Sequence, residues 1–241
     1  MTDEAPGPLI WSLPEPPGRP TTSLSRAEIL RAALTIADAE GARALTMRRV
    51  ATAVGASTPM SLYRYVGSKD GLVDLMIDAV YGEIALPPDA AEWRTGLERL
   101  ALSTWTVIQR HLWFGELVHT RPPLGPNALR YFDFRFALLE PLDLSADELS
   151  LVTGAVDGHI FGAALQSAEE LRMRSRVGLR TDADLAAAAR PILDPILSGD
   201  RYPAFARWFH ARTGSGPADP VAWTLACLLD GITDRLGLPK P

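Results

Sequence analysis

Apolar residues recur at every third or fourth position from residue 25 to residue 236, and no stretch alternates apolar with polar residues. This spacing puts apolar side chains on one face of an α-helix, whereas alternation is the pattern of a half-buried strand. Helix ends are marked as well, because Ser25 and Glu28 have capping-box spacing and Gly41 follows the last apolar position of that segment. The sequence therefore predicts an all-α protein.

Composition narrows the class further. The chain has 241 residues, of which 47% are hydrophobic, so it can hold a small domain and a larger one. The single cysteine, Cys227, excludes an internal disulfide and a zinc site built from cysteines. Asp3 and Glu4 stand where a signal peptide is basic, and no run of about eighteen apolar residues occurs. We expect a soluble, cytoplasmic protein with no membrane partner.

Charge is distributed unevenly along the chain. The formal net charge is −5, yet residues 21–70 hold seven basic and four acidic side chains and so carry +3. Residues 1–20 carry −2 and residues 71–241 carry −6. Charge asymmetry between segments bears on partners more directly than whole-chain charge does. The acidic total therefore does not exclude a polyanionic partner for residues 21–70.

Residues 46–66 have the pattern of a helix-turn-helix, with a tight turn at Gly55 between two short helices. The predicted core positions are Met47, Val50, Ala51, Val54, Leu62 and Val66. The second helix then exposes hydroxyl, aromatic, thioether and guanidinium groups, at Ser57, Thr58, Met60, Ser61, Tyr63, Arg64 and Tyr65. Such groups suit phosphates, base edges and thymine methyls, whereas a merely solvated helix is usually rich in Glu and Lys. We therefore predict binding to double-stranded DNA, with Arg48, Arg49 and Lys69 neutralising flanking phosphates.

Residues 25–83 resemble the N-terminal DNA-binding domain of the TetR family of transcriptional regulators. The resemblance rests on ILRAALTIADAEGARALTMRRVATAVG and on SLYRYVGSKDGLVDLM. It implies a DNA surface that comprises Thr46, Arg48, Thr58, Pro59, Ser61, Tyr63, Tyr65 and Lys69, in which Tyr63 and Lys69 anchor phosphates. Six residues separate Gly55 from Leu62 here, where most members have five. Which of Ser57, Thr58 and Met60 faces the bases therefore stays open.

The expected organisation has three parts. A Pro-rich, disordered arm spans residues 1–20, and a three-helix, helix-turn-helix DNA-binding domain spans 21–70, with a connecting helix over 69–85. A helical bundle for ligand binding and dimerisation, which resembles the family's more loosely, spans 86–241. Two alternatives remain for the arm: Arg19 enters a minor groove, or the apolar cluster Leu9, Ile10, Trp11 and Leu13 docks on the body.

Two segments of the bundle predict a homodimer. Gly154, Gly158 and Gly162 recur every fourth residue of a predicted helix over 146–172, where small residues allow a partner helix to approach closely. The last helix is apolar around most of its circumference, including Trp223, Leu225 and Leu229, so it needs a second partner. The alternative is that both helices lie at the centre of one chain.

The effector site is less sharply marked. Its candidates are aromatic or polar residues on mainly apolar helices: Trp105, Trp113, Phe114, Phe132, Phe136, His159 and Gln166. For His159 the alternative is a hydrogen-bonded residue of the core or interface, and each aromatic residue has the alternative of a core position.

The leading hypothesis is a dimeric repressor that a small-molecule effector releases from a palindromic operator. The alternatives are a helical enzyme, an activator, and a protein-partnered regulator without a small ligand. Against an enzyme, the chain has no HExxH motif or nucleophile triad, and its four histidines lack the i, i+4 spacing of metal ligands. We expect no cofactor and no metal.

Overall fold

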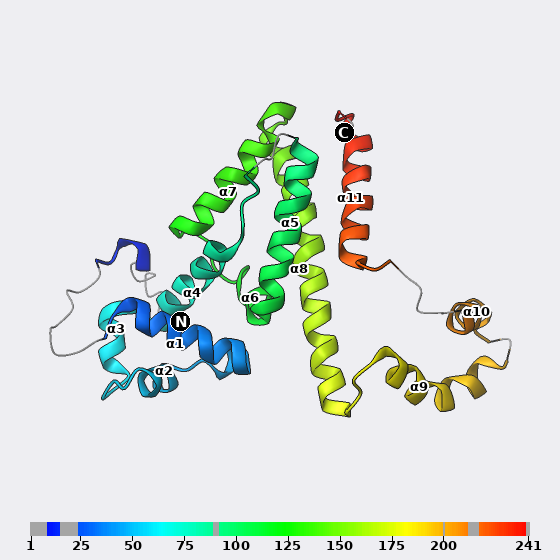
Figure 1. The fold of residues 1–241 in the computed structure, drawn as a ribbon, viewed down its shortest axis with the longest axis horizontal. Helices are drawn as coiled ribbons and strands as arrows, with labels where there is room; N and C mark the ends of the chain where they lie inside the picture. Colours follow the sequence, from blue (N-terminus) through cyan, green and yellow to red (C-terminus); the bar gives the residue numbers. More distant parts are fainter. Residues whose placement is uncertain (1–8, 15–23, 89–91, 200, 212–216, 240–241) are drawn as a thin grey trace, which may run out of the picture.

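The computed structural model describes residues 9–14, 24–88, 92–199, 201–211 and 217–239. Within these ranges the chain is helical and has no strand, which confirms the predicted fold class. The N-terminal unit, called the head below, holds α1 (Arg26–Glu40), α2 (Met47–Ala53) and α3 (Met60–Val66). The helix α4 (Lys69–Glu83) leads from the head into the second unit (Figure 1).

The second unit, called the body below, is a helical bundle beside the head. It consists of α5 (Trp93–Arg110), α6 (Leu112–Leu117), α7 (Pro126–Leu139), α8 (Ala146–Val177) and α11 (Pro220–Leu236). The 32 residues of α8 make a rod of about 48 Å, at about 1.5 Å per residue. In Figure 1 this rod runs the height of the body, with α5 on one side and α11 on the other.

Local sequence explains where the helices begin and end. Ser25 caps α1 and Ser145 caps α8, each in a capping box with the glutamate three residues later. Gly178 ends α8 in the left-handed conformation, with φ 72°, which a residue without a side chain adopts at little cost. These caps satisfy backbone groups that a helix end otherwise leaves unpaired.

One apolar core runs from the head into the body. Ile29, Leu62 and Val66 are fully buried in the head, and Leu225 and Leu229 are fully buried where α11 meets the body. Between them, α4 is buried on nearly every side from Gly71 to Val80. The head is therefore packed against the body rather than attached by a free linker.

Two helices extend away from the body. The helices α9 (Asp182–Leu197) and α10 (Pro203–Ala211) pack against each other and project from the lower end of α8 (Figure 1). Several of their large apolar side chains are exposed, namely Ile192, Ile196, Phe205 and Trp208. We call α9 and α10 the extension.

The N-terminal segment departs from the prediction. Disorder was expected over residues 1–20, but residues 10–12 form a short 3₁₀ helix, η1 (Ile10–Ser12), in which Ile10 is 2% exposed. The expectation is wrong here because the apolar side chains find a site on the rest of the chain, which was the second alternative. Arg19 and the other residues of 1–8 and 15–20 lie outside the described residues.

Candidate nucleic-acid interface and effector cavity

The helix-turn-helix is held by a compact internal packing. Val50 and Ala51 of α2 meet Leu62 and Val66 of α3, and all four are at most 2% exposed. The turn between the helices contains Gly55 at φ 67°, and the backbone N–H of Ala56 donates to the carbonyl of Ala51 at 2.8 Å. The small side chain of Ala51 allows the two helices to lie close together.

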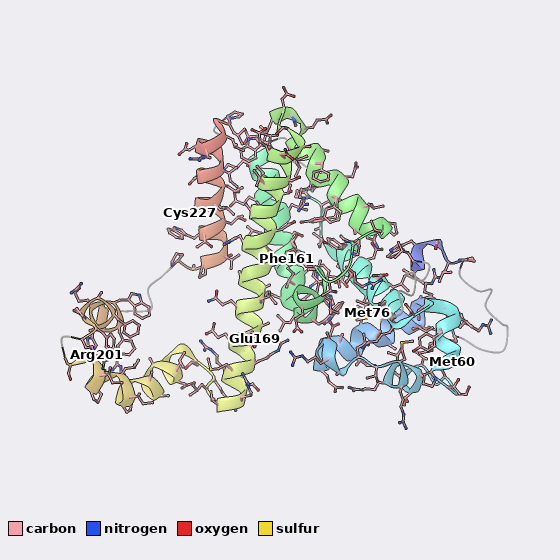
Figure 2. All side chains as sticks on the ribbon, turned by 180° about the vertical axis from the view of Figure 1, so that it is seen from behind. Met60, Met76, Phe161, Glu169, Arg201 and Cys227 are labelled. Carbon is pink, nitrogen blue, oxygen red and sulfur yellow. The ribbon has the colours of Figure 1, made fainter. Side chains whose placement is uncertain are left out.

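The outer surface of this unit carries most of the predicted DNA-binding residues. Exposed are Thr46, Arg48, Ser57, Thr58, Met60, Arg64 and Lys69, and half-buried are Pro59, Ser61 and Tyr63. Met60 is 72% exposed, and Figure 2 shows it at the free end of the head. Two of the hydroxyls also serve the fold, because Thr46 caps α2 and Ser61 donates to the carbonyl of Thr58 at 2.7 Å.

Two residues do not lie as expected. Tyr65 is only 6% exposed and belongs to the core, so its prediction as a DNA-surface residue is wrong. It follows Arg64 on the helix, and the 3.6-residue period turns its ring inward beside Leu62 and Val66. Arg49 pairs with Glu40 of α1 rather than standing free for a phosphate.

Lys69 stands at a helix start. It is the first residue of α4, and Ser68 caps this helix by accepting the backbone N–H of Gly71 at 2.9 Å. Unpaired N–H groups and the helix dipole favour anions at such an end, so the exposed ammonium of Lys69 adds to a field that is already positive. This arrangement suits a phosphate.

A cavity of about 440 Å³ opens between the head-linking helix and the body. It is lined by Tyr81 of α4, residues 118–123, Phe132 of α7, and Asp157 and Phe161 of α8. Figure 2 shows Phe161 midway along α8. We call residues 118–125 the pocket loop. The lining combines three aromatic rings with polar and charged side chains, so it offers both apolar faces and hydrogen-bonding groups to a small molecule.

Charges beside the cavity are balanced. Arg135 is buried, and its Nη1 donates to both carboxylate oxygens of Asp157 at 2.8 and 2.7 Å. Its guanidinium also lies 5.1 Å from the ring centre of Phe132. Burial raises the pKa of Tyr81, so this phenol stays neutral and presents a hydroxyl rather than a charge. The Nε of Arg135 has no hydrogen-bond partner among the described residues.

The predicted effector residues are mostly elsewhere. Phe132 lines the cavity, whereas Trp113 and Phe114 are buried behind it, with the Phe114 ring 5.4 Å from that of Tyr81. The remaining four predictions, Trp105, Phe136, His159 and Gln166, also lie outside the lining. His159 lies 3.1 Å from the hydroxyl of Thr224 and 3.3 Å from the carbonyl of Val221, so it joins α8 to α11.

Sequence reasoning missed other lining residues, including Tyr81, His119, Arg121 and Asp157. Tyr81 was assigned only to the connecting helix. The available signal was the turn-rich RPPLGPN segment, because a loop of this kind between two helices often lines a site.

Polar contacts join the head and α4 to the body at several places, two of which lie near the DNA-binding surface or the cavity. At the first, Asp38 of α1 accepts a hydrogen bond from the indole N–H of Trp113 at 2.6 Å and lies 2.7 Å from Nδ1 of His111. At the second, the guanidinium of Arg121 contacts Asp74 and Asp70 of α4, in each case at 3.0 Å. The second place belongs to the pocket loop, so the cavity wall itself binds the helix that begins at Lys69.

The predicted dimer residues fall into two groups. Gly154, Gly158 and Gly162 are exposed, and a Cβ atom added to any of them would meet nothing within 4 Å. Trp223 is 58% exposed. Leu225 and Leu229 are fully buried inside the single chain, which corrects their prediction as interface residues: they face α5 and α8, not an open surface.

Other kinds of site are not indicated in the described part of the chain. It contains no group of three or more His, Cys, Asp or Glu side chains that could hold a metal ion. None of its helices is both long and apolar enough to cross a membrane.

Comparison with known proteins decides the family. Residues 29–76 match the family model described as bacterial regulatory proteins, tetR family, and residues 86–236 match the Tetracyclin repressor-like, C-terminal domain. The chain belongs to the TetR family. It is therefore a DNA-binding transcriptional regulator with a helix-turn-helix head and a helical C-terminal domain.

TetR-family relatives and structures agree with this assignment. The chain is 37% identical to the HTH-type transcriptional repressor DrrR1 of Streptomyces coeruleorubidus, over 93% of this chain and 83% of the relative. It is 33% identical to an HTH-type transcriptional regulator of Saccharopolyspora erythraea, over 84% and 85%. The structure of ActR from Streptomyces coelicolor in complex with actinorhodin has a TM-score of 0.67 and 25% identity, covering 89% of this chain and 99% of ActR.

Proposed function

We propose that this TetR-family regulator is a homodimeric repressor that leaves a palindromic operator when a small molecule enters the cavity beside Phe161. One observation carries the proposal: the pocket loop both lines the cavity and, through Arg121, binds Asp70 and Asp74 at the start of α4. A ligand that moves this loop therefore changes the support of the residues next to Lys69. Binding of the effector then lowers the affinity for the operator, and binding of the operator lowers the affinity for the effector by the same factor.

The lining supports an effector class. Rings of Tyr81, Phe132 and Phe161 offer edges and faces to a flat apolar molecule, and the neutral Tyr81 hydroxyl offers a hydrogen bond. The ActR complex with actinorhodin adds that a structurally similar regulator binds a small molecule. The expected effector is an aromatic ring compound with hydroxyl or carbonyl groups, and it reaches the regulator in the cytoplasm.

The exposed face of α8 and α11 supports the homodimer. Leu151 and Leu165 are 72% and 40% exposed on α8, on either side of the glycine series, and Trp223 is exposed on α11. Apolar groups exposed together mark an interaction surface, and open glycines allow a second copy of α8 to lie close. Two heads would then meet two half-sites about one helical turn of DNA apart.

Selection from random DNA with the full-length chain tests operator reading. The expected product is a palindrome, and recovery of no enriched sequence would overturn sequence-specific binding. Anisotropy titrations of the selected duplex with a panel of polycyclic phenols and quinones then test release. Compounds that raise the melting temperature of the free protein should weaken the complex. If stabilising compounds leave operator affinity unchanged, effector release is wrong.

A pair of variants connects release to the cavity. Phe132→Trp adds volume inside the lining, so it should abolish the effect of the compound while leaving operator affinity near the wild-type value. Phe136→Trp is the matched control, because Phe136 lies on the same helix but is 42% exposed and outside the lining. Equal losses of response in both variants would place the effector elsewhere.

A further inference from the structure

The N-terminal segment occupies a site at the junction of head and body. Ile10 is 2% exposed although it lies in a single turn of 3₁₀ helix, and Trp11 and Leu13 pack against the same core. In Figure 1 this dark blue segment lies beside the start of α4 and the lower end of α7. Leu9, the preceding residue, is 43% exposed and faces outward.

Gly67 and Gly125 leave space for Leu13 and Trp11, whereas a Cβ atom at Gly71 would first meet the carbonyl oxygen of Val66. A Cβ atom at Gly67, in the turn before α4, would lie 2.8 Å from Cδ1 of Leu13. A Cβ atom at Gly125, just before α7, would lie 2.6 Å from the Trp11 ring, and one at Gly71 would lie 3.4 Å from Cβ of Ile10. Gly125 also leaves space for the carboxylate of Asp78. The first two distances are shorter than real Cβ contacts, so a side chain at Gly67 would displace the end of Leu13, and one at Gly125 would displace Trp11 as well as Asp78.

Hydrogen bonds fix the end of the segment to the head. The Nη2 of Arg26, on α1, donates to the carbonyl of Leu13 at 3.1 Å. The Nε of the same guanidinium donates to the carbonyl of Tyr65 in α3 at 3.0 Å. The side chain of Arg26 therefore holds both the N-terminal segment and the C-terminal end of α3, the recognition helix of the helix-turn-helix.

The other side of the segment touches the pocket loop. Trp11 lines a small cavity together with Pro122, Pro123, Leu124 and Gly125. The same cavity is lined by Asp74, which Arg121 binds. Trp11 thus lies against the back of the loop whose front lines the effector cavity.

We propose that residues 10–13 form an interdomain strap. In this strap Ile10 and Leu13 hold the head and Trp11 holds the pocket loop, so that together they position α3, the recognition helix, relative to the effector cavity. The strap makes no DNA contact in this role; Ile10 and Trp11 are positioning residues. They act through α4 and the turn at Gly67, immediately before Lys69. The inference rests on the proposed function only for its operator readout.

The main test measures head position directly and needs no DNA. In a Cys227→Ser background, the protein carries spin labels at two added cysteines: Thr52→Cys on the exposed side of α2, and Glu140→Cys at an exposed position just after α7. Excess unlabelled protein keeps the measured distances within one chain. Trp11→Ala and Ile10→Ala should broaden the distance distribution, while Leu9→Ala, the matched control, should leave it unchanged. If both strap variants keep the width of the wild-type distance distribution, the proposal is wrong and the segment contributes packing only.

Operator affinity provides the second readout. Trp11→Ala should weaken binding roughly 2- to 30-fold, the range found for residues that couple two sites. Trp11→Phe keeps a ring against Gly125. Its distance distribution and its operator affinity should both lie between those of the alanine variant and those of the wild type. This variant keeps the test valid if the alanine variant misfolds. Failure of the wild type to bind any operator would overturn the proposed function, yet the distance measurement would still decide the strap.

Discussion

Lys69 and Met60 are predicted to have different tasks in DNA binding. Lys69 is exposed at the N-terminus of α4, where helix dipole and ammonium charge both favour a phosphate. Met60 begins α3, has no charge, and is more exposed than any other large apolar residue of the head. An apolar side chain so exposed on a DNA-binding helix is suited to contact with a thymine methyl.

Lys69→Ala should weaken binding to all sequences alike, because a phosphate contact carries no base information. The slope of log affinity against log salt concentration should also fall by about one. Anisotropy titrations at several salt concentrations measure both effects. Arg43→Ala, at another exposed basic residue of the head, is the control and should leave the slope unchanged.

Met60→Ala should change base preference rather than general affinity. The expected result is a loss at one or two positions of the operator, about 1–3 kcal/mol at each. Binding to a set of single-base operator variants measures the effect. A uniform loss across the set would show that Met60 does not read bases.

Arg121→Gln should destabilise the protein by about 2 kcal/mol, because it leaves the buried carboxylate of Asp74 without its cation. Urea unfolding at a fixed protein concentration measures the change. The double variant Arg121→Gln with Asp74→Asn should recover part of the loss. If the second substitution only adds to the first, the two side chains are not coupled.

At the scale of helices, α8 provides the sharpest contrast between sequence and structure. Its start and its glycine series were predicted from the sequence, because helical period is a local signal, although the predicted span of 146–172 falls short of the end at Val177. The burial of Leu225 and Leu229 within their own chain could not be predicted, because an apolar helix can be buried either by its own chain or by a partner. The cavity lining was missed for a related reason: it depends on how distant helices pack, which one segment's sequence does not specify. Tyr65 differs, because its position three residues after Leu62 was a local signal of burial that the prediction did not use.

Gly158→Ala should distinguish a dimer face from an open surface. Where α8 faces only solvent, alanine should stabilise the helix by about 1 kcal/mol, because the added methyl meets no atom. Where a second α8 packs against it, the methyl should hold the helices apart and weaken association. Sedimentation at a series of protein concentrations measures the dissociation constant of the dimer. A lower dissociation constant in the variant would contradict the proposed interface.

At the scale of the whole molecule, head and body are fastened at several places around α4, of which three have been described above. Asp38 meets His111 and Trp113, Arg121 meets Asp70 and Asp74, and the strap fills the junction beside Gly125. The sequence indicated two domains, but not that a shared core and long-range polar contacts join them. A signal from the cavity therefore has several routes to the head, which is consistent with coupling spread over many residues.

The pairing of Arg121 with Asp70 has a consequence for the local electric field. All four acidic side chains of residues 21–70 have partners: Glu28 in a capping box, Glu40 on Arg49, Asp38 at the body and Asp70 on Arg121. Asp70 follows Lys69 directly, so withdrawal of Arg121 leaves this exposed carboxylate without its cation, next to the predicted phosphate anchor. Movement of the pocket loop would then repel the DNA backbone electrostatically, even if the spacing of the two heads stayed the same.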